Sequence, residues 1–146
     1  MYGIIWDDRW SIGDELIDSQ HKELVKLVNE LVISCDNKKA DISAALSFLV
    51  QYTITHFDDE EKLQQSCGFP HYEEHKQMHD NLKSIAGRLV AEHDEFGSTS
   101  KLQDALRNIL MKWLVDHITV EDKKIGDYIW YQKSRKAFIL PSTYTE

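Results

Sequence analysis

The chain has 146 residues, of which 42% are hydrophobic and 29% are charged, a composition typical of a single globular domain with a buried core. Its 17 basic and 25 acidic residues give a formal net charge of -8. This charge argues against nucleic acid or anionic lipid as the main partner, because both select clustered basic side chains. No apolar run approaches the roughly 20 residues of a membrane span, and the first residues do not resemble a secretory signal. We therefore expect a cytoplasmic protein with no membrane partner.

The sequence begins with an arm and continues with four amphipathic segments. Residues 1–17 lack helical periodicity and are expected to lie as an extended arm over the helix ends, where Trp6 and Trp10 would cover the core. Apolar residues then recur at helical spacing in four segments, at about residues 18–35, 41–66, 71–92 and 100–131. Residues 132–146 would form a short tail.

Short connections between these segments predict the topology. They favour an all-α fold, an antiparallel up-down-up-down four-helix bundle in one domain, because short loops leave no room for a crossover. Asp18 or Ser19 should cap the first helix and Asp41 the second. Cys35 and Cys67 are expected to be small buried thiols. In the bundle they would lie about 39 Å apart, far beyond the 7 Å or so that a disulfide allows.

Histidines and carboxylates interrupt the apolar faces of the predicted helices. Counting from the loops places at least one such residue of every helix at the same height in the bundle: His21, His56, Glu60, His75 and His117. His56 and Glu60, like His75 and His79, are four residues apart and project from one helix face. Burying these groups unpaired would cost several kcal/mol each, so metal coordination is the most economical interpretation.

The spacing favours Glu121 over Asp122 as the acidic ligand of the last helix. Glu121 follows His117 by four residues and fits an ideal helix face, whereas Asp122 follows by five. Asp122 would need a local π-bulge or a long-reaching carboxylate. His71 and His93, at the two ends of the third helix, are expected to be solvated residues or end caps.

The residue types restrict the metal and its chemistry. Imidazoles and carboxylates suit iron, zinc, copper or nickel, and neither cysteine falls in the ligand layer. His75 is followed by Lys76, so the HExxH motif of metalloproteases is missing. The paired Glu-x-x-His motifs of ferritin-like di-iron enzymes are also missing. The remaining possibility is a pair of metal ions held by many histidines and few carboxylates.

The chain resembles the hemerythrins, specifically the single-domain bacterial kind, from Ile5 to Tyr131. The resemblance rests on IIWDDRWSIGDELIDSQHKEL, HFDDEEK, GFPHYEEHKQMH and KWLVDHITVEDKKIGDY. It implies a non-haem di-iron centre with an oxo or hydroxo bridge, whose ligands are His21, His56, Glu60, His75, His79, His117 and Asp122. It favours Asp122 over Glu121.

The resemblance also implies how the ligands divide. Glu60 and Asp122 would bridge the two irons, with His75, His79 and His117 on one iron and His21 and His56 on the other. The iron with two histidines would keep one open position, where the family binds O2. The walls of the O2 pocket would be Leu24, Phe57, Trp113, Leu114 and Ile118.

The leading hypothesis is therefore a protein that reversibly binds O2 for storage, transport or delivery and that is not an enzyme. O2 would be its small-molecule ligand, and an unidentified electron donor would reduce the irons. Two alternatives remain: a di-iron enzyme that reduces peroxide or nitric oxide, and an oxygen or iron sensor that acts through a partner.

Two features depart from the family pattern. Asp58 and Asp59 place acid beside His56 and Glu60, and Gln64 stands where relatives often carry an apolar residue. A more polar pocket rim would speed autoxidation or admit other small ligands. The positions of the two aspartates fit a solvated helix face equally well.

Overall fold

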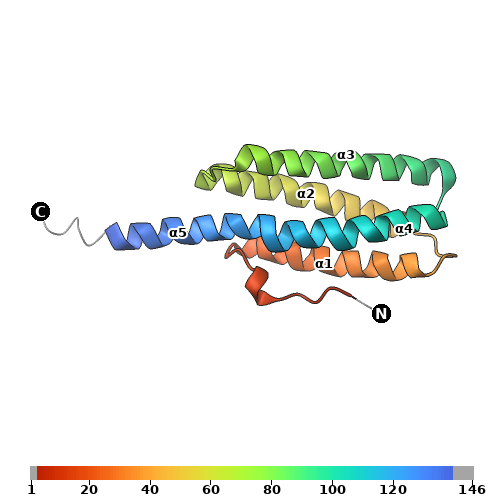
Figure 1. The fold of residues 1–146 in the computed structure, drawn as a ribbon, viewed down its shortest axis with the longest axis horizontal. Coiled ribbons are helices and arrows are strands. Elements are labelled where there is room, and N and C mark those ends of the chain that lie inside the picture. The colour runs from red at the N-terminus through yellow and green to blue at the C-terminus, as the bar shows by residue number, and fades with distance from the viewer. Residues whose placement is uncertain (1–2, 140–146) are drawn as a thin grey trace, which may run out of the picture.

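The computed structural model describes residues 3–139, and every regular element in that range is helical (Figure 1). Successive long helices run in opposite directions, as predicted for an up-down-up-down bundle. Within the described range, no helix combines the length and hydropathy of a membrane span. The elements are the 3-10 turn Asp8–Trp10, α1 (Glu15–Asp36), α2 (Ser43–Cys67), α3 (Tyr72–Phe96), α4 (Ser100–Ile109), two π-helical segments (Leu110–Leu114 and His117–Asp122) and α5 (Lys123–Ile139).

The last four of these elements form one continuous helical rod, which is longer than predicted. The rod was expected to end near residue 131, but it continues to Ile139. The sequence between residues 127 and 139 contains neither glycine nor proline, so nothing in it stops a helix. α3 likewise continues past residue 92 to Phe96, and Gly97 follows it with a φ of 77°.

α1 begins at Glu15, earlier than predicted, because Asp14 caps it. The Asp14 carboxylate accepts a hydrogen bond from the backbone N–H of Ile17 at 3.0 Å, which is the geometry of an N-cap. The prediction of Asp18 or Ser19 as the cap is wrong, and both residues lie inside the first turns of the helix.

α2 begins at Ser43, two residues after the predicted cap. The Asp41 carboxylate accepts a hydrogen bond from the backbone N–H of Ser43 at 2.9 Å, so its side chain does support the helix start. The N-cap position itself belongs to Ile42, whose side chain makes no capping bond.

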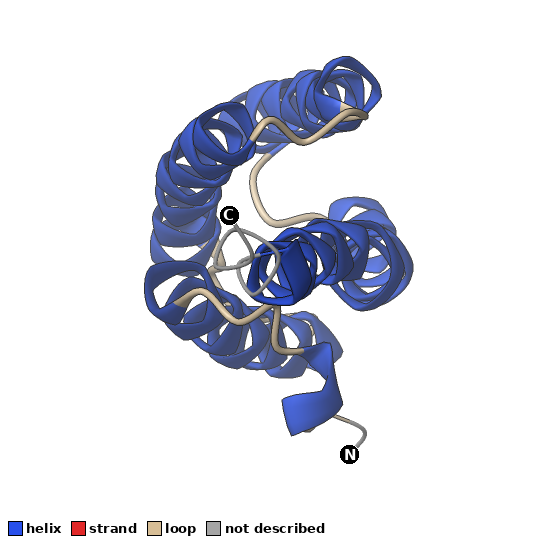
Figure 2. Ribbon diagram, turned by 90° about the vertical axis from the view of Figure 1, so that its left-hand side faces the viewer, coloured by secondary structure: helices blue, strands red, loops and turns tan. Residues whose placement is uncertain are grey.

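The arm is tied to α1 by its backbone. The N–H of Ile4 donates to the side-chain oxygen of Asn29 at 2.8 Å, and the Asn29 amide donates to the carbonyl of Ile4 at 2.7 Å. Trp6 is partly buried against the core, and Trp10 meets it edge to face with ring centroids 5.7 Å apart. Figure 2, which looks along the bundle, shows the arm on the outside of the helices.

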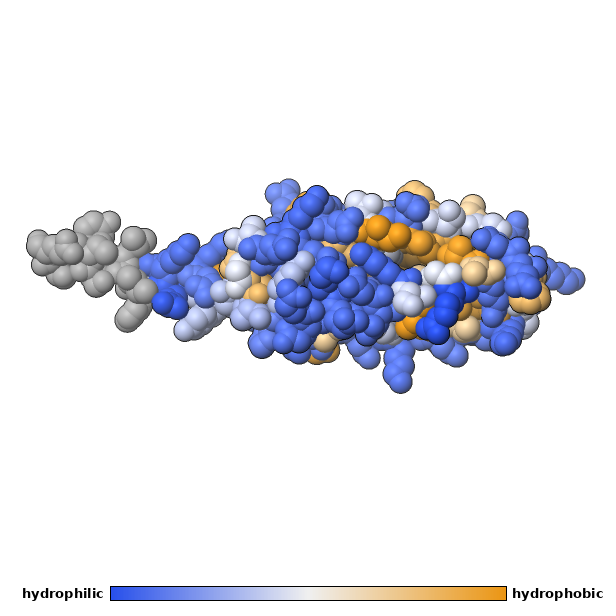
Figure 3. Space-filling view, turned by 90° about the horizontal axis from the view of Figure 1, so that it is seen from above, coloured by the Kyte–Doolittle hydropathy of each residue, from blue (hydrophilic) through white to orange (hydrophobic). Residues whose placement is uncertain are grey.

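The helices contribute unequally to the core. α1 buries ten residues along its length, whereas α3 buries only His75 and His79. The predicted apolar face of α3 is therefore only half buried, and it lines an apolar cavity of about 180 Å³ between α2, α3 and α4. Figure 3 shows this cavity as an apolar hollow on the α3 side of the molecule. The α3 residues that line it include Leu82, Ile85, Ala86 and Leu89.

The two cysteines are free thiols, as predicted. Cys35 is buried, but Cys67 is only half buried at the end of α2. The expectation of a buried thiol is therefore wrong for Cys67, because the last turn of α2 is partly open to solvent.

Gly126 allows α5 to pack directly on the arm. A Cβ atom there would lie 2.6 Å from the Cα of Ile12, so the arm would have to move. We expect Gly126→Ala to lower the free energy of unfolding by about 1–3 kcal/mol, measured by urea denaturation. The control is Gly87→Ala in α3, where a Cβ would have no neighbour within 4 Å. That change should stabilise by about 0.5–1 kcal/mol. Similar effects of both changes would contradict the close approach.

Candidate metal centre

Seven buried histidine and acidic side chains meet at one level of the bundle. Every long helical rod supplies at least one of them, and each is at most 4% exposed. The structure thus brings together the whole predicted set. Its members are His21 from α1, His56 and Glu60 from α2, His75 and His79 from α3, and His117 and Asp122 from the π-helical segment before α5.

These side chains form two groups that share two members. Within each group, one potential ligand atom per residue lies within 4.8 Å of the others. Glu60 and Asp122 belong to both groups, which is the arrangement that two carboxylate-bridged cations require. The histidines divide into His75, His79 and His117 in one group and His21 and His56 in the other.

A π-helical turn brings His117 and Asp122 onto the same face. The segment His117–Asp122 has π-type hydrogen bonding, which accommodates one residue more than an α-helical turn. The Nε2 atom of His117 consequently lies 2.9 Å from Oδ1 of Asp122. Glu121, which fits an ideal α-helix, lies outside the centre and pairs with Lys124 at 3.1 Å. The bulge that the spacing of Asp122 required is therefore present.

Glu60 lies at the middle of the cluster. One of its carboxylate oxygens is 2.9 Å from Nε2 of His75 and 3.2 Å from that of His79. The other oxygen is 3.3 Å from Nε2 of both His21 and His56. Burial raises the pKa of Glu60, but its hydrogen bonds with the histidines outweigh burial and hold the pKa well below the ordinary value.

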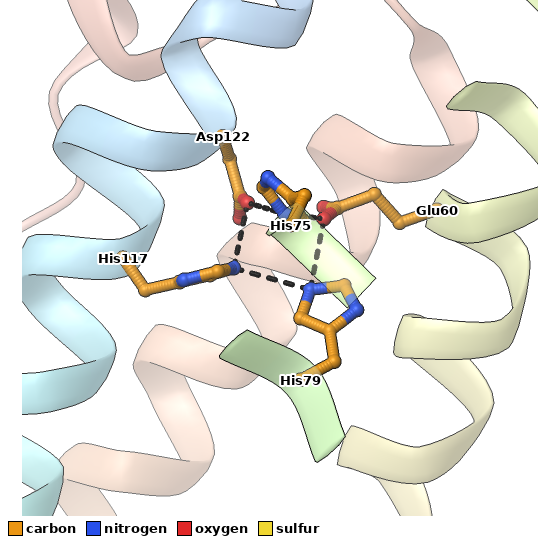
Figure 4. A group of neighbouring side chains, drawn as sticks. All are labelled: Glu60, His75, His79, His117 and Asp122. Carbon is orange, nitrogen blue, oxygen red and sulfur yellow. Dashed lines mark hydrogen bonds and ion pairs between the residues drawn. The ribbon is translucent and has the colours of Figure 1, made fainter. Parts of the chain in front are cut away.

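Asp122 faces the same point from the opposite rod, as Figure 4 shows for one of the two groups. Its oxygens lie 2.9–3.0 Å from Nε2 of His21, His75 and His117, yet neither makes a hydrogen bond of acceptable geometry. Burial and the charge of Glu60 raise the pKa of Asp122, but the interactions with His117 and His21 outweigh them and lower it. Close N···O contacts without hydrogen-bond alignment fit groups that converge on a cation between them.

The negative charges of Glu60 and Asp122 raise the pKa values of two of the histidines. Burial lowers the pKa of His21 and of His75, but their close polar contacts with the negative charges of Asp122 and Glu60 outweigh it. The pKa rises to about 10 for His21 and to about 9 for His75. Two acids that stabilise positive charge on neighbouring imidazoles this strongly are also suited to bind multivalent cations.

Two polar side chains behind the histidines were missed by the sequence analysis. The side-chain oxygen of Gln20 accepts a hydrogen bond from Nδ1 of His56 at 2.8 Å, and its amide nitrogen donates to Asp59 at 2.7 Å. Glu61 accepts from Nδ1 of His79 at 2.9 Å. Such bonds fix the ring so that Nε2 faces the centre. Each of the two residues adjoins a predicted ligand in the sequence, and that adjacency is the only signal that could have found them.

The residues that depart from the family pattern fall into different environments. Asp58 is exposed, 4.0 Å from Lys83, and so belongs to a solvated helix face. Asp59 is half buried and reaches the centre only through the Gln20 amide. Gln64 is fully buried, and neither polar atom of its side chain has a hydrogen-bond partner.

Apolar side chains adjoin the histidines where the O2 pocket was predicted. Leu24, Phe57, Leu114 and Ile118 are buried, and Trp113 is half buried. The Phe57 ring stacks on His79 with centroids 3.7 Å apart, and Trp113 stacks on His117 at 4.5 Å. Phe57 also lines the cavity between α2, α3 and α4. Of the predicted pocket residues, Phe57 and Trp113 therefore lie directly against the histidine layer.

The other two histidines lie away from the centre, at the ends of α3. His71 is exposed at the N-cap position. The Nε2 atom of His93 lies 3.1 Å from the Ser43 hydroxyl and 3.2 Å from that of Ser98. Both residues are therefore associated with helix ends, as predicted.

An antiparallel four-helix bundle with a buried layer of five imidazoles and two shared carboxylates defines a protein class built to hold a pair of cations without thiolates. The family model described as "Hemerythrin HHE cation binding domain" matches residues 12–129. The chain belongs to the hemerythrin family.

Known relatives cover most of the chain. A bacteriohemerythrin of Stenotrophomonas maltophilia is 30% identical over 128 residues, which are 86% of this chain and 81% of the relative. A bacteriohemerythrin of Pseudomonas aeruginosa is 31% identical over 136 residues, covering 92% and 86%. The myohemerythrin of Riftia pachyptila is 32% identical over 120 residues, covering 82% and 88%.

Solved structures support the same fold. A wild-type hemerythrin structure aligns with a TM-score of 0.71 at 26% identity and covers 85% of this chain and 95% of its own. A leucine-to-alanine mutant of hemerythrin aligns with a TM-score of 0.74, at the same identity, over 88% and 98%. The predicted bundle is therefore confirmed.

Proposed function

We propose that this chain is a non-haem di-iron protein that binds O2 reversibly for storage, transport or delivery, and that it is not an enzyme. The observation that carries the proposal is the pair of ligand groups that share Glu60 and Asp122. Membership of the hemerythrin family supports iron as the metal and O2 as the ligand.

We assign His75, His79 and His117 to one iron and His21 and His56 to the other, with both carboxylates bridging. If both irons were octahedral, five imidazoles, two bridging carboxylates and a bridging oxo or hydroxo group would fill about eleven of about twelve coordination positions. The open position would then fall on the iron held by two histidines. When bound, the iron pair supplies electrons for the reduction of O2 and the position at which O2 enters.

The residues around the centre favour binding over catalysis. The side chains assigned to the pocket wall are apolar and exclude water and protons from the ligand. An enzyme needs a proton source close to the reacting atoms. Asp59, the half-buried acid beside the centre, is separated from His56 by the Gln20 amide, which hydrogen-bonds to both.

A single preparation tests the proposed function. Metal analysis should find two irons per chain, and the visible spectrum should change on exposure to air and return on deoxygenation. One metal per chain, or irreversible oxidation without a distinct spectrum, would contradict the proposal. Turnover of peroxide or nitric oxide far above the autoxidation rate would instead identify an enzyme.

Leu114 tests the role of the apolar wall. It is 4% exposed in the π-helical segment before His117. We expect Leu114→Thr to keep two irons but to shorten the lifetime of the oxygenated form by about tenfold, because the hydroxyl brings a proton donor into the pocket. Iron analysis and the decay of the visible spectrum in air measure the two quantities.

The matched control is Leu106→Thr, a change in α4 at a residue that is 3% exposed and belongs to the core. Both variants should lose about 2–4 kcal/mol of stability through lost packing. Only Leu114→Thr should alter the lifetime. Equal lifetimes in the two variants would mean that Leu114 serves packing alone.

A further inference from the structure

The C-terminal part of α5 projects beyond the rest of the bundle. Figure 1 shows α5 continuing past the end at which α1 and α3 begin. We name residues 130–136 the α5 overhang. The match to the family model ends at residue 129, just before the overhang begins. Trp130 and Tyr131 at its base are 71% and 56% exposed.

The overhang is basic in an acidic protein. α5 contains five basic side chains and one acidic, a net charge of +4, whereas the remainder of the chain carries -12. Lys133, Arg135 and Lys136 are all exposed, and none forms an ion pair with another described residue. Aromatic and unpaired basic side chains therefore occupy the same short helix.

The end of the bundle from which the overhang projects is acidic. Glu15 lies in the first turn of α1, and Glu73 and Glu74 lie in the first turn of α3. Asp127 lies on α5 itself, just before the overhang, and all four acids are exposed. The overhang cannot fold back on them, because Lys136 lies nine residues, or about 14 Å, further along the same helix than Asp127.

We propose that the α5 overhang is a dimerisation surface that takes a second copy of this chain in antiparallel orientation. Trp130 and Tyr131 of each copy pack on the overhang of the other. Lys136 of each copy then faces the acidic end of the other bundle, where Asp127 lies. A two-fold axis between the overhangs makes both contacts twice and closes the assembly at a dimer.

Two physical arguments favour a second copy of this chain as the partner of the overhang. Within residues 3–139, α5 has few contacts with elements other than the helix that precedes it, and a helical end of this length is only marginally stable in water by itself, so the overhang gains from a packing partner. The surface is complementary to itself, because it combines aromatic side chains, basic groups and an acidic end, whereas the large negative charge of the bundle opposes an anionic lipid surface. The overhang is smaller than the roughly 800 Å² per partner of a standard interface, so we expect a weak, salt-sensitive dimer.

Sedimentation velocity of the iron-loaded full-length chain over a concentration series tests the proposal. The parent should dimerise, and Lys136→Glu should raise the dissociation constant by about tenfold, because each dimer loses two attractive contacts. Adding Asp127→Lys to that variant should restore the parent value to within about threefold. Trp130→Ser should weaken the dimer in the same assay. Iron content and circular dichroism report whether each variant is folded.

The matched control is Lys101→Glu, an equal charge change at an exposed residue in the first turn of α4, at the far end of the bundle. It should leave the dissociation constant unchanged. A monomer at every concentration, a failed charge-swap rescue, or an equal effect of Lys101→Glu would overturn the proposal. Cosedimentation of a monomeric chain with phosphatidylglycerol vesicles, lost in Trp130→Ser, would overturn it in favour of a lipid surface.

Discussion

Glu60→Gln is expected to retain no more than one iron per chain and to lower the free energy of unfolding of the iron-free protein by about 3–5 kcal/mol. Glu60 is fully buried, and its two oxygens lie within 3.3 Å of four imidazole nitrogens. The amide has the same size but removes the negative charge that faces these rings. It also removes the oxygen that would bridge the second iron. Metal analysis and urea denaturation measure the two effects.

The matched control is Asp58→Asn, which neutralises an exposed carboxylate on the same helix. Its contact with Lys83 is at 4.0 Å, so we expect a change within about 0.5 kcal/mol and two irons per chain. Two bound irons in Glu60→Gln, with stability close to that of the control, would show that Glu60 is a packing residue.

The iron-free protein is expected to lose stability as the pH rises through about 9 and 10, the pKa values of His75 and His21. Burial lowers both pKa values, but Asp122 and Glu60 outweigh it and raise them from 6.5. The folded state therefore binds these protons more tightly than the unfolded state does. Their stabilising contribution is complete below about pH 6.5 and is lost above the folded-state pKa values.

The two carboxylates determine how the stability of the iron-free protein changes at acidic pH. The pKa values of Glu60 and Asp122 are lowered in the folded state, so their contribution is present above the ordinary carboxyl range and is lost as the pH falls below it. The iron-free protein should be most stable between these limits. Urea denaturation across a pH series gives the profile.

Iron binding should remove the loss of stability at alkaline pH, because coordination requires deprotonated imidazoles. The iron-loaded protein is expected to remain stable through pH 9 to 10 and to release iron in acid, when protons compete for the ligands. The same urea series on both forms is the comparison. If the two forms had identical pH profiles, the raised histidine pKa values would have no bearing on metal binding.

Helix periodicity and loop length were sufficient to predict the bundle, and residue counting predicted the height of the ligand layer. Counting works because an α-helix rises uniformly, so equal distances from a loop bring antiparallel helices to the same level. Counting favoured Glu121, which lies outside the centre, over Asp122, since it assumes 3.6 residues per turn and the chain has a π-helical turn there. Resemblance to the family supplied the choice of Asp122.

Other features depend on geometry that periodicity does not contain. Asp14, Asp18 and Ser19 are all residue types that cap helices, and only the path of the arm selects Asp14. Gln20 and Glu61 contact the backs of imidazole rings, which requires the positions of neighbouring helices. Periodicity also identifies the apolar face of α3, but not how closely the other helices approach it.

Because the other helices approach the apolar face of α3 only loosely, metal binding would affect how firmly α3 packs in the bundle. Two histidines are the only fully buried side chains of this helix, so its cohesion with the other rods is concentrated where cations would bind. A cation shared with α2 and the last helix would act as a cross-link in addition to the half-buried aliphatic contacts of α3. Binding of the cations would therefore also hold α3 against the other helices.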